Sequence, residues 1–300
     1  MNEGILNLNK PRGLTSHDVV ARVRGLTGAR RVGHAGTLDP LATGVLLVCI
    51  GRATRVSEYL MTGRKVYRAR VRLGVSTDTY DAEGQVVAEA EVEVSRTQLE
   101  AALAQFRGQI AQLPPMYSAI KREGTPLYRL ARQGVEVERE PRQVEIFRLE
   151  LAEWDPPECT LELACSQGTY VRALAHDLGR ALGCGAHLAG LVRRASGRFR
   201  LEETITLNEF AQAAAEGRWP DLLHPIDAAL AHFPTLHLSA DEARRLCQGQ
   251  SIHGERMAEA DLARAYGPDG TFLALAAYDP KDGVWRPHKV FRQTGDPKGF

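Results

Sequence analysis

The sequence lacks the long hydrophobic runs and the paired cysteines that mark membrane-spanning and secreted proteins. Its longest apolar run, Gly44 to Ile50, is far too short to cross a bilayer. Residues 1–10 are polar and mixed, so we expect no signal peptide. The five cysteines are scattered and form no C-x-x-C pair. We therefore expect a cytoplasmic chain with reduced thiols.

Common enzyme signatures are also absent. The sequence contains no G-x-S-x-G, Walker, H-E-x-x-H or G-x-G-x-x-G pattern. Cys184 and His187 have a metal-like spacing, but no second pair completes a site. We predict no metal site, and the familiar hydrolase, nucleotide-binding and metalloprotease classes are disfavoured.

Charge is nearly balanced overall but unevenly placed. The net charge is +1, yet residues 10–72 carry 13 Lys/Arg against three acids, a net of +10. Residues 202–270 carry 12 acids against five Arg, a net of −7. A basic first quarter can hold a polyanion such as nucleic acid. A solvated basic face has the same composition, so charge alone leaves both interpretations open.

Strand-like and helix-like segments interleave without a regular βα alternation. This order favours a mixed α+β sheet over a Rossmann or barrel fold. We expect strands at residues 5–8, 45–50, 65–74, 85–89, 144–154, 160–165, 272–278 and 288–291. We expect helices at residues 17–26, 97–106, 126–132, 170–182 and 239–247.

Three of the helix starts carry capping signals. Ser16 is placed to cap the first helix. Thr97 with Glu100, and Ser239 with Glu242, have the spacing of a capping box. Residues 65–74 alternate, which predicts one buried face and one row of guanidinium groups. The buried face is Tyr67, Ala69, Val71 and Leu73, and the outer row is Arg68, Arg70 and Arg72.

Asp39 is the most unusual carboxylate in the chain. It is a lone acid in the glycine-rich segment 33–44, with basic sequence on both sides. The segment holds too much glycine for regular structure, so we expect a loop. Asp39 followed by Pro40 is also typical of a helix start, with Asp as N-cap. The local pattern alone favours capping over chemistry.

Three other candidates have equally ordinary interpretations. His34 is a loop histidine that would bond to backbone. Tyr67 lies on an apolar strand face, where tyrosine is normally a core residue. Arg172 comes early in a helix, where arginine is normally solvated.

Segment 33–44, GHAGTLDPLATG, closely resembles the catalytic loop of the TruB family of tRNA pseudouridine synthases. Further segments resemble other motifs of that family in the same order, over about two-thirds of the chain. They are residues 8–13, 65–68 with 77–84, 114–121, 165–172 and 183–188. Asn9 and Val66 depart mildly from the family pattern. The tail from Phe233 resembles a PUA-like RNA-binding module.

The resemblance implies a fold and a division of the chain. It implies a mixed, largely antiparallel central sheet flanked by helices, with a small, mostly β module at the C-terminal end. We expect a catalytic domain over residues 1–231 and a PUA-like domain over residues 232–300.

The resemblance also implies a reaction. Asp39 is the nucleophile or base that starts the isomerisation of a uridine, and Arg172 is the cation that keeps it ionised. Tyr67 stacks on the uracil, and its hydroxyl is available for proton transfer. The substrate implied is the T-stem-loop of tRNA, at the uridine conventionally numbered 55. No metal or organic cofactor is implied.

RNA contacts follow from the same resemblance. The target base must leave its stack, and His34 lies where an imidazole could stack on bases. Lys10 and Tyr170 are candidates for shaping the RNA pocket. The arginines expected to neutralise phosphates are Arg30, Arg31, Arg52, Arg55, Arg68, Arg70 and Arg72.

Three alternatives stay open. A guide-dependent synthase would work inside a ribonucleoprotein, but this chain begins almost at its first motif, which favours independent action. A non-catalytic RNA-folding protein would keep only the pocket. A base-excising N-glycosidase would release free uracil. We expect a monomer with no obligatory protein partner.

Overall fold

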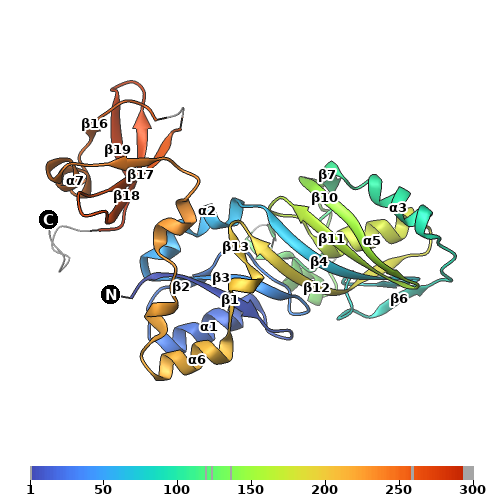
Figure 1. Ribbon diagram of the computed structural model, residues 1–300. Helices are drawn as coiled ribbons and strands as arrows, with labels where there is room; N and C mark the ends of the chain where they lie inside the picture. The colour runs from blue at the N-terminus through green and yellow to red at the C-terminus, as the bar shows by residue number, and fades with distance from the viewer. Residues whose placement is uncertain (1, 119, 123, 136, 258–259, 293–300) are drawn as a thin grey trace.

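The computed structural model describes residues 2–118, 120–122, 124–135, 137–257 and 260–292. Figure 1 shows a large sheet with its helices and, at one end, a smaller lobe built from the C-terminal part of the chain. No helix in the described ranges is long and apolar enough to cross a membrane.

A ten-stranded sheet runs through the larger part. Its strands are β1 (Gly4–Lys10), β2 (Val32–His34), β3 (Thr43–Ile50), β4 (Lys65–Leu73), β7 (Gly108–Gln112), β10 (Arg142–Asp155), β11 (Glu158–Cys165), β12 (Ala186–Ser196), β13 (Phe199–Arg200) and β14 (Ile205–Thr206). The main order is β14-β1-β3-β12-β4-β11-β10-β7, with β2 paired to β3 and β13 to β12. The β1–β14 and β3–β12 pairs are parallel and the other pairs are antiparallel. The expected mixed, largely antiparallel α+β fold is confirmed.

Four of the six α-helices in this part bury apolar side chains in one extended core against the sheet. The α-helices of the larger part are α1 (Ser16–Thr27), α2 (Ser57–Thr62), α3 (Arg96–Ala104), α4 (Leu127–Arg132), α5 (Val171–Ala181) and α6 (Leu207–Ala215). The 3₁₀ turns are η1 (Gly51–Val56), η2 (Leu201–Glu203), η3 (Trp219–Leu222) and η4 (Ile226–Leu230). Val19 and Val23 of α1 and Leu174 and Leu178 of α5 lie in the same buried cluster. Helix α5 contacts β12, a strand in the middle of the order.

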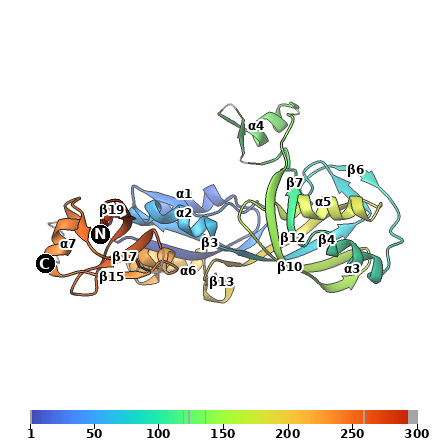
Figure 2. The ribbon, with the colours of Figure 1, turned by 90° about the horizontal axis from the view of Figure 1, so that it is seen from above.

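Two short hairpins lie outside the main sheet. They are β5 (Val75–Thr77) with β6 (Val86–Glu89), and β8 (Lys121–Arg122) with β9 (Thr125–Pro126). Figure 2 shows that the segment carrying α4 stands clear of the sheet. The predicted loop at residues 113–118 leads into this projection and has no helix or strand.

The alternation predicted for β4 is confirmed. Tyr67, Ala69, Val71 and Leu73 are buried, whereas Arg70 and Arg72 are exposed. Two of the three predicted capping residues are wrong, although the helices begin within one residue of the expected positions. Thr15 caps α1 through a box with Asp18, and Ser95 caps α3 through a box with Gln98. The box between Ser239 and Glu242 is confirmed at the start of α7.

The smaller lobe is a five-stranded sheet with one helix. Its elements are β15 (Thr235–His237), α7 (Ala240–Cys247), β16 (Ile252–His253), β17 (Leu262–Tyr266), β18 (Phe272–Asp279) and β19 (Val284–Val290). The strand order is β15-β17-β18-β19-β16. Of these elements, α7, β18 and β19 were expected from the sequence. Leu275 and Phe291 of this lobe share an apolar cluster with Leu47 and Leu60 of the larger part, so the two parts pack through a common core.

Gly44, at the start of β3, carries a testable constraint. Its φ is +99°, and a Cβ added there would lie 2.3 Å from the carbonyl oxygen of Arg193. Gly13 also has a positive φ, +85°, but a Cβ there would meet nothing within 4 Å. We expect Gly13→Ala to lower the free energy of unfolding by about 1 to 2 kcal/mol through backbone strain alone. Gly44→Ala should lose about 1 to 3 kcal/mol more, because β12 must move.

Urea unfolding of both variants measures the difference. Equal losses would mean that the close approach of β3 and β12 at Gly44 does not matter for stability.

Candidate active site

Asp39 lies in the connection between β2 and β3, and no helix begins there. Residues 40–41 form a turn, so the helix-cap interpretation of Asp39 is wrong. The α1 side chain of Ser16 holds this connection through two hydrogen bonds. The Ser16 hydroxyl donates to the Leu38 carbonyl and accepts from the Leu38 N–H, at 3.1 and 2.8 Å. Ser16 therefore holds the residue before Asp39 instead of capping α1.

The Asp39 carboxylate faces Arg172. Arg172 Nη2 lies 3.0 Å from Asp39 Oδ1, and the two residues are 133 positions apart in the sequence. The Arg172 side chain is 6% exposed, so the arginine expected to be solvated is buried. Asp39 is 33% exposed. Partial burial raises the pKa of Asp39, and the neighbouring guanidinium of Arg172 opposes that rise.

A second carboxylate, Asp81, stands on the other side of Arg172. Its Oδ2 lies 3.7 Å from Arg172 Nη1, and its side chain is 6% exposed. Thr79 Oγ1 donates to Asp81 Oδ1 at 2.7 Å. The charge of Asp81 raises the pKa of Asp39. Arg172 thus bridges two carboxylates and can compensate both.

Asp81 was missed among the candidate residues although the segment 77–84 was noticed. The feature that points to Asp81 is the backbone conformation of its neighbour. Tyr80 has a φ of +66° and is the one described residue other than glycine with positive φ. The Tyr80 ring stacks on His176, with centroids 3.9 Å apart. A positive φ at tyrosine persists only where surrounding contacts enforce it.

Tyr67 of β4 is buried at 7% exposure and lies in the core, as its strand position suggests. It pairs in register with Arg193 of β12. Burial raises the pKa of Tyr67, the charge of Arg193 opposes that rise, and the charge of Asp39 adds to it. Asp39 and Arg172 are thus in direct contact, and Tyr67, from a third segment, is near enough for the charge of Asp39 to act on it.

Lys10 is inside the protein. It is fully buried, and its Nζ donates to the carbonyls of Pro11, Leu14 and Pro40 at 2.9, 2.6 and 3.4 Å. Burial lowers its pKa to about 8. These contacts suit shaping of the site, and they leave the ammonium group away from solvent phosphates.

Tyr170 and His34 border the same region. Tyr170 precedes α5, exchanges backbone hydrogen bonds with the Gln112 side chain, and has the Arg172 guanidinium 5.9 Å from its ring centroid. His34 lies on β2, and its buried Nδ1 has no hydrogen-bond partner within the described ranges. The backbone-bonded interpretation of His34 is therefore wrong for this nitrogen. Burial lowers the pKa of His34, which favours the neutral ring.

The arginines expected to bind phosphate differ in their surroundings. On the outer face of β4, Arg68 pairs with Glu153 at 2.5 Å and Arg70 with Glu158 at 3.4 Å. Both pairs are exposed, so they contribute little to stability and could exchange for other anions. A phosphate role for either arginine stays a prediction.

Arg52 and Arg55 lie where the larger part meets the smaller lobe. Arg52 pairs with Glu3 and donates from Nη1 to the Phe291 carbonyl. Arg55 donates to the Val290 carbonyl at 2.6 Å. These two arginines hold the smaller lobe in this structure, and their predicted phosphate contacts would compete with that role.

Arg30, Arg31 and Arg72 are exposed. None of them has an ion pair with a carboxylate in the part of the chain that the structure describes. Arg30 and Arg31 directly precede β2, the strand that leads into the Asp39 segment. They are the better placed of the predicted phosphate ligands.

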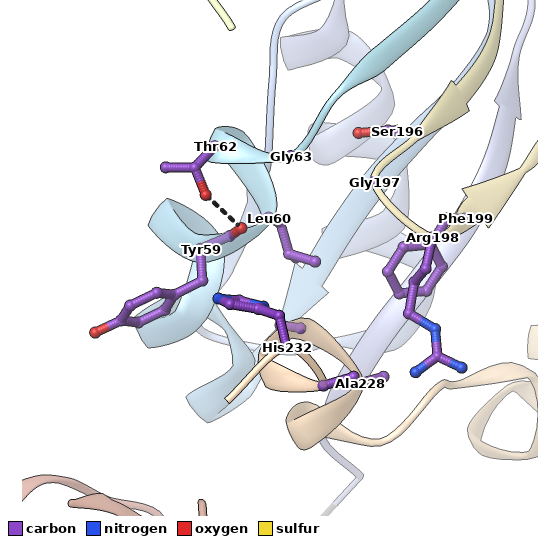
Figure 3. A pocket seen from close by; sticks show the side chains of 12 residues that line it. Tyr59, Leu60, Thr62, Gly63, Ser196, Gly197, Arg198, Phe199, Ala228 and His232 are labelled. Carbon is purple, nitrogen blue, oxygen red and sulfur yellow. Dashed lines mark hydrogen bonds between the residues drawn. The ribbon is translucent and has the colours of Figure 1, made fainter. Parts of the chain in front are cut away.

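A separate pocket lies between α2, the β12–β13 turn and η4 (Figure 3). Its volume is about 310 Å³, and its walls include Leu60, Phe199 and Ala229. It contains none of the predicted site residues, and we assign it no part in the chemistry.

Three family models together match almost the whole chain. "TruB family pseudouridylate synthase (N terminal domain)" matches residues 24–171. "tRNA pseudouridylate synthase B C-terminal domain" matches residues 172–231, and "tRNA Pseudouridine synthase II, C terminal" matches residues 233–292.

Known proteins give the same result. A "tRNA pseudouridine synthase B" of Dehalococcoides mccartyi is 44% identical over 98% of this chain and 99% of its own. One of Stutzerimonas stutzeri is 46% identical over 96% of this chain and 95% of its own. The solved "Crystal Structure of a Cbf5-Nop10-Gar1 Complex" contains a chain with a TM-score of 0.75 and 26% identity, covering 97% of this chain and 85% of that one.

Arg172 and Asp81 act on the pKa of Asp39 in opposite directions, which can be tested by removing each charge. Arg172→Met removes the cation and should raise the pKa of Asp39, whereas Asp81→Asn removes a like charge and should lower it. Arg180→Met, on the same helix but exposed, should leave the pKa of Asp39 unchanged. Titration of ¹³C-labelled aspartate carboxylates by NMR measures all three. Shifts of the same sign in Arg172→Met and Asp81→Asn would contradict this electrostatic description.

Proposed function

The chain belongs to the TruB family of pseudouridine synthases, and on that premise we propose that it converts uridine 55 in the T-loop of tRNA to pseudouridine. The observation that carries the proposal is the contact between Asp39 and Arg172 at the centre of the sheet, with Tyr67 beside it. The two residues are 133 positions apart, and burying the Arg172 guanidinium costs free energy, so stability is a weak explanation for this contact.

The reaction moves one glycosidic bond. The bond from N1 of uracil to C1′ of ribose breaks, the base rotates, and C5 bonds to C1′. C5 gives up its proton and N1 gains one, so the reaction needs no oxidant, reductant or cofactor. Asp39 provides the ionised carboxylate that forms a covalent adduct and later leaves. Attack at C6 of the base and assistance at C1′ both begin from this ionised state.

Arg172 keeps the Asp39 carboxyl group in its ionised, reactive form. Desolvation pushes the carboxyl toward its protonated, unreactive form, and the guanidinium 3.0 Å away favours the charged form. The ionised fraction of Asp39 falls as the pH drops through its raised pKa, so activity should fall on the acid side. Asp81 holds the opposite edge of the guanidinium and so fixes its direction.

We assign Tyr67 to the flipped uracil and His34 to the bases beside the position that the uracil leaves. A uridine in a folded loop must be flipped out before a side chain can reach it, which costs a few kcal/mol. We assign Tyr67 to stack on the flipped uracil, with its hydroxyl available for proton transfer. The neutral imidazole of His34 stacks on neighbouring bases. Lys10 and Tyr170 shape the pocket, and Arg30 and Arg31 neutralise phosphates beside it.

The test is release of tritium from tRNA labelled at C5 of uracil. The wild-type protein should release tritium to water without free uracil, and Asp39→Ala and Asp39→Asn should release none above background. Binding of tRNA should be retained in Asp39→Asn, since the amide keeps the shape of the carboxylate. Equal release by wild type and Asp39→Ala would sink the assignment of Asp39, and free uracil would indicate an N-glycosidase instead.

We also propose that the enzyme acts as a cytoplasmic monomer without a protein partner, with catalytic residues 1–231 and a PUA-like RNA-binding domain at 232–300. Support comes from the higher identity to relatives named for tRNA than to the chain from the Cbf5-Nop10-Gar1 complex. Sedimentation equilibrium should give a mass near 33.0 kDa at every concentration tested. A constant mass of twice that value would overturn the monomer.

A further inference from the structure

Arg193, on β12, is a fully buried cation with no role in the proposed chemistry. It is 1% exposed, and no described carboxylate lies within ion-pair distance of it. A buried charge without a counter-ion is costly unless hydrogen bonds compensate it. Its position therefore requires another explanation.

The guanidinium group is compensated by the backbone that surrounds Asp39. Nη2 donates to the Gly36 carbonyl at 3.0 Å and Nη1 to the Thr37 carbonyl at 3.2 Å. Nε donates to the Val45 carbonyl at 2.7 Å. Two acceptors precede Asp39 and one follows it, so a single side chain holds the connection on both sides of the carboxylate.

Arginine suits this position better than any other residue. Its planar group offers five donors in a fixed arrangement, whereas the lysine ammonium is a compact charge on a flexible stem. The backbone is fitted to it as well. Gly44 pairs with Arg193 in register, and its positive φ lets the two backbones approach. Gly36 also has a positive φ, +106°, and lies against Nη1.

The charge of Arg193 also reaches the reacting groups. It lowers the pKa of Asp39 and of Tyr67, in the same direction as Arg172 acts on Asp39. Arg172 and Arg193 have different surroundings, however. Arg172 contacts the carboxylate itself, whereas Arg193 donates to the backbone on either side of it.

We propose that Arg193 is a positioning residue for the isomerisation, whose guanidinium fixes the Asp39 connection so that the carboxylate is presented between Arg172 and Tyr67. The inference rests on the proposed function. A purely structural residue would affect only folding. The positioning role of Arg193 also makes the rate of the chemical step depend on the geometry of its N–H donors and on its charge.

The test compares Arg193→Lys and Arg193→Met with the same changes at Arg194. Arg194 is the adjacent residue, 41% exposed and paired with Glu202, so it is a matched control. The measurements are the single-turnover rate of tritium release with saturating tRNA, the Kd for tRNA and the melting temperature. A parallel measurement, amide hydrogen exchange of residues 36–45, does not depend on activity.

Arg193→Lys should slow the single turnover on the order of a hundredfold, since a displacement of about 1 Å can cost that much. Its Kd for tRNA should change less than threefold, and exchange at residues 36–45 should accelerate. Arg193→Met should be at least as slow, and the acid limb of its rate profile should lie at higher pH than that of Arg193→Lys, because a cation near Asp39 is gone. Both Arg194 variants should match the wild type.

A folded Arg193→Lys protein with the wild-type rate would overturn the inference, and so would a loss confined to tRNA affinity. If Arg193→Met does not fold, Arg193→Lys decides alone. Failure of the proposed function is recognised separately, because the wild type itself would then release no tritium, while the exchange of residues 36–45 would still report whether Arg193 holds the connection.

Discussion

A carboxylate that loses part of its solvation stays ionised most readily with a cation at contact distance, and Arg172 is that cation for Asp39. Asp39 follows β2, and Arg172 begins the helix that packs on β12. The two groups meet because β3 and β12 are neighbours at the middle of the strand order. Glycine at position 44 permits that neighbourhood, and Ser16 and Lys10 hold the connection from the α1 side. The fold thus places the Asp39–Arg172 contact beside a central parallel strand pair.

The positive charges of the first quarter and of β12 do three kinds of work. Lys10 and Arg193 are buried and bind carbonyl groups, and their charges lower the pKa of Asp39. Arg52 and Arg55 bind backbone carbonyls of the smaller lobe. Only the exposed arginines are left for RNA. Net charge along the sequence was compatible with a polyanionic partner, but burial decides which of these cations could meet one.

The sequence predicted what is periodic or local and missed what depends on pairing. The alternation of β4 and the stripe of α5 were visible because a buried face repeats every two or 3.6 residues. Asp39, Tyr67 and Arg172 were found by resemblance, since their local patterns favoured capping, core and solvent roles. Asp81 and Arg193 were not singled out, because a carboxylate behind a strained tyrosine and an arginine bound to carbonyls have no local signature. The short strands β15, β16 and β17 were missed, since two to five residues carry too little periodicity to predict a strand.

The central claim is that one carboxylate, held between Arg172 and Tyr67, meets a uridine taken out of its stack. A crystal structure of Asp39→Asn bound to an unmodified T-stem-loop tests it most directly. The account predicts uridine 55 outside the loop stack, with its ring against Tyr67 and its glycosidic bond within contact distance of residue 39. A uridine still stacked in the loop, or bound away from residue 39, would contradict it.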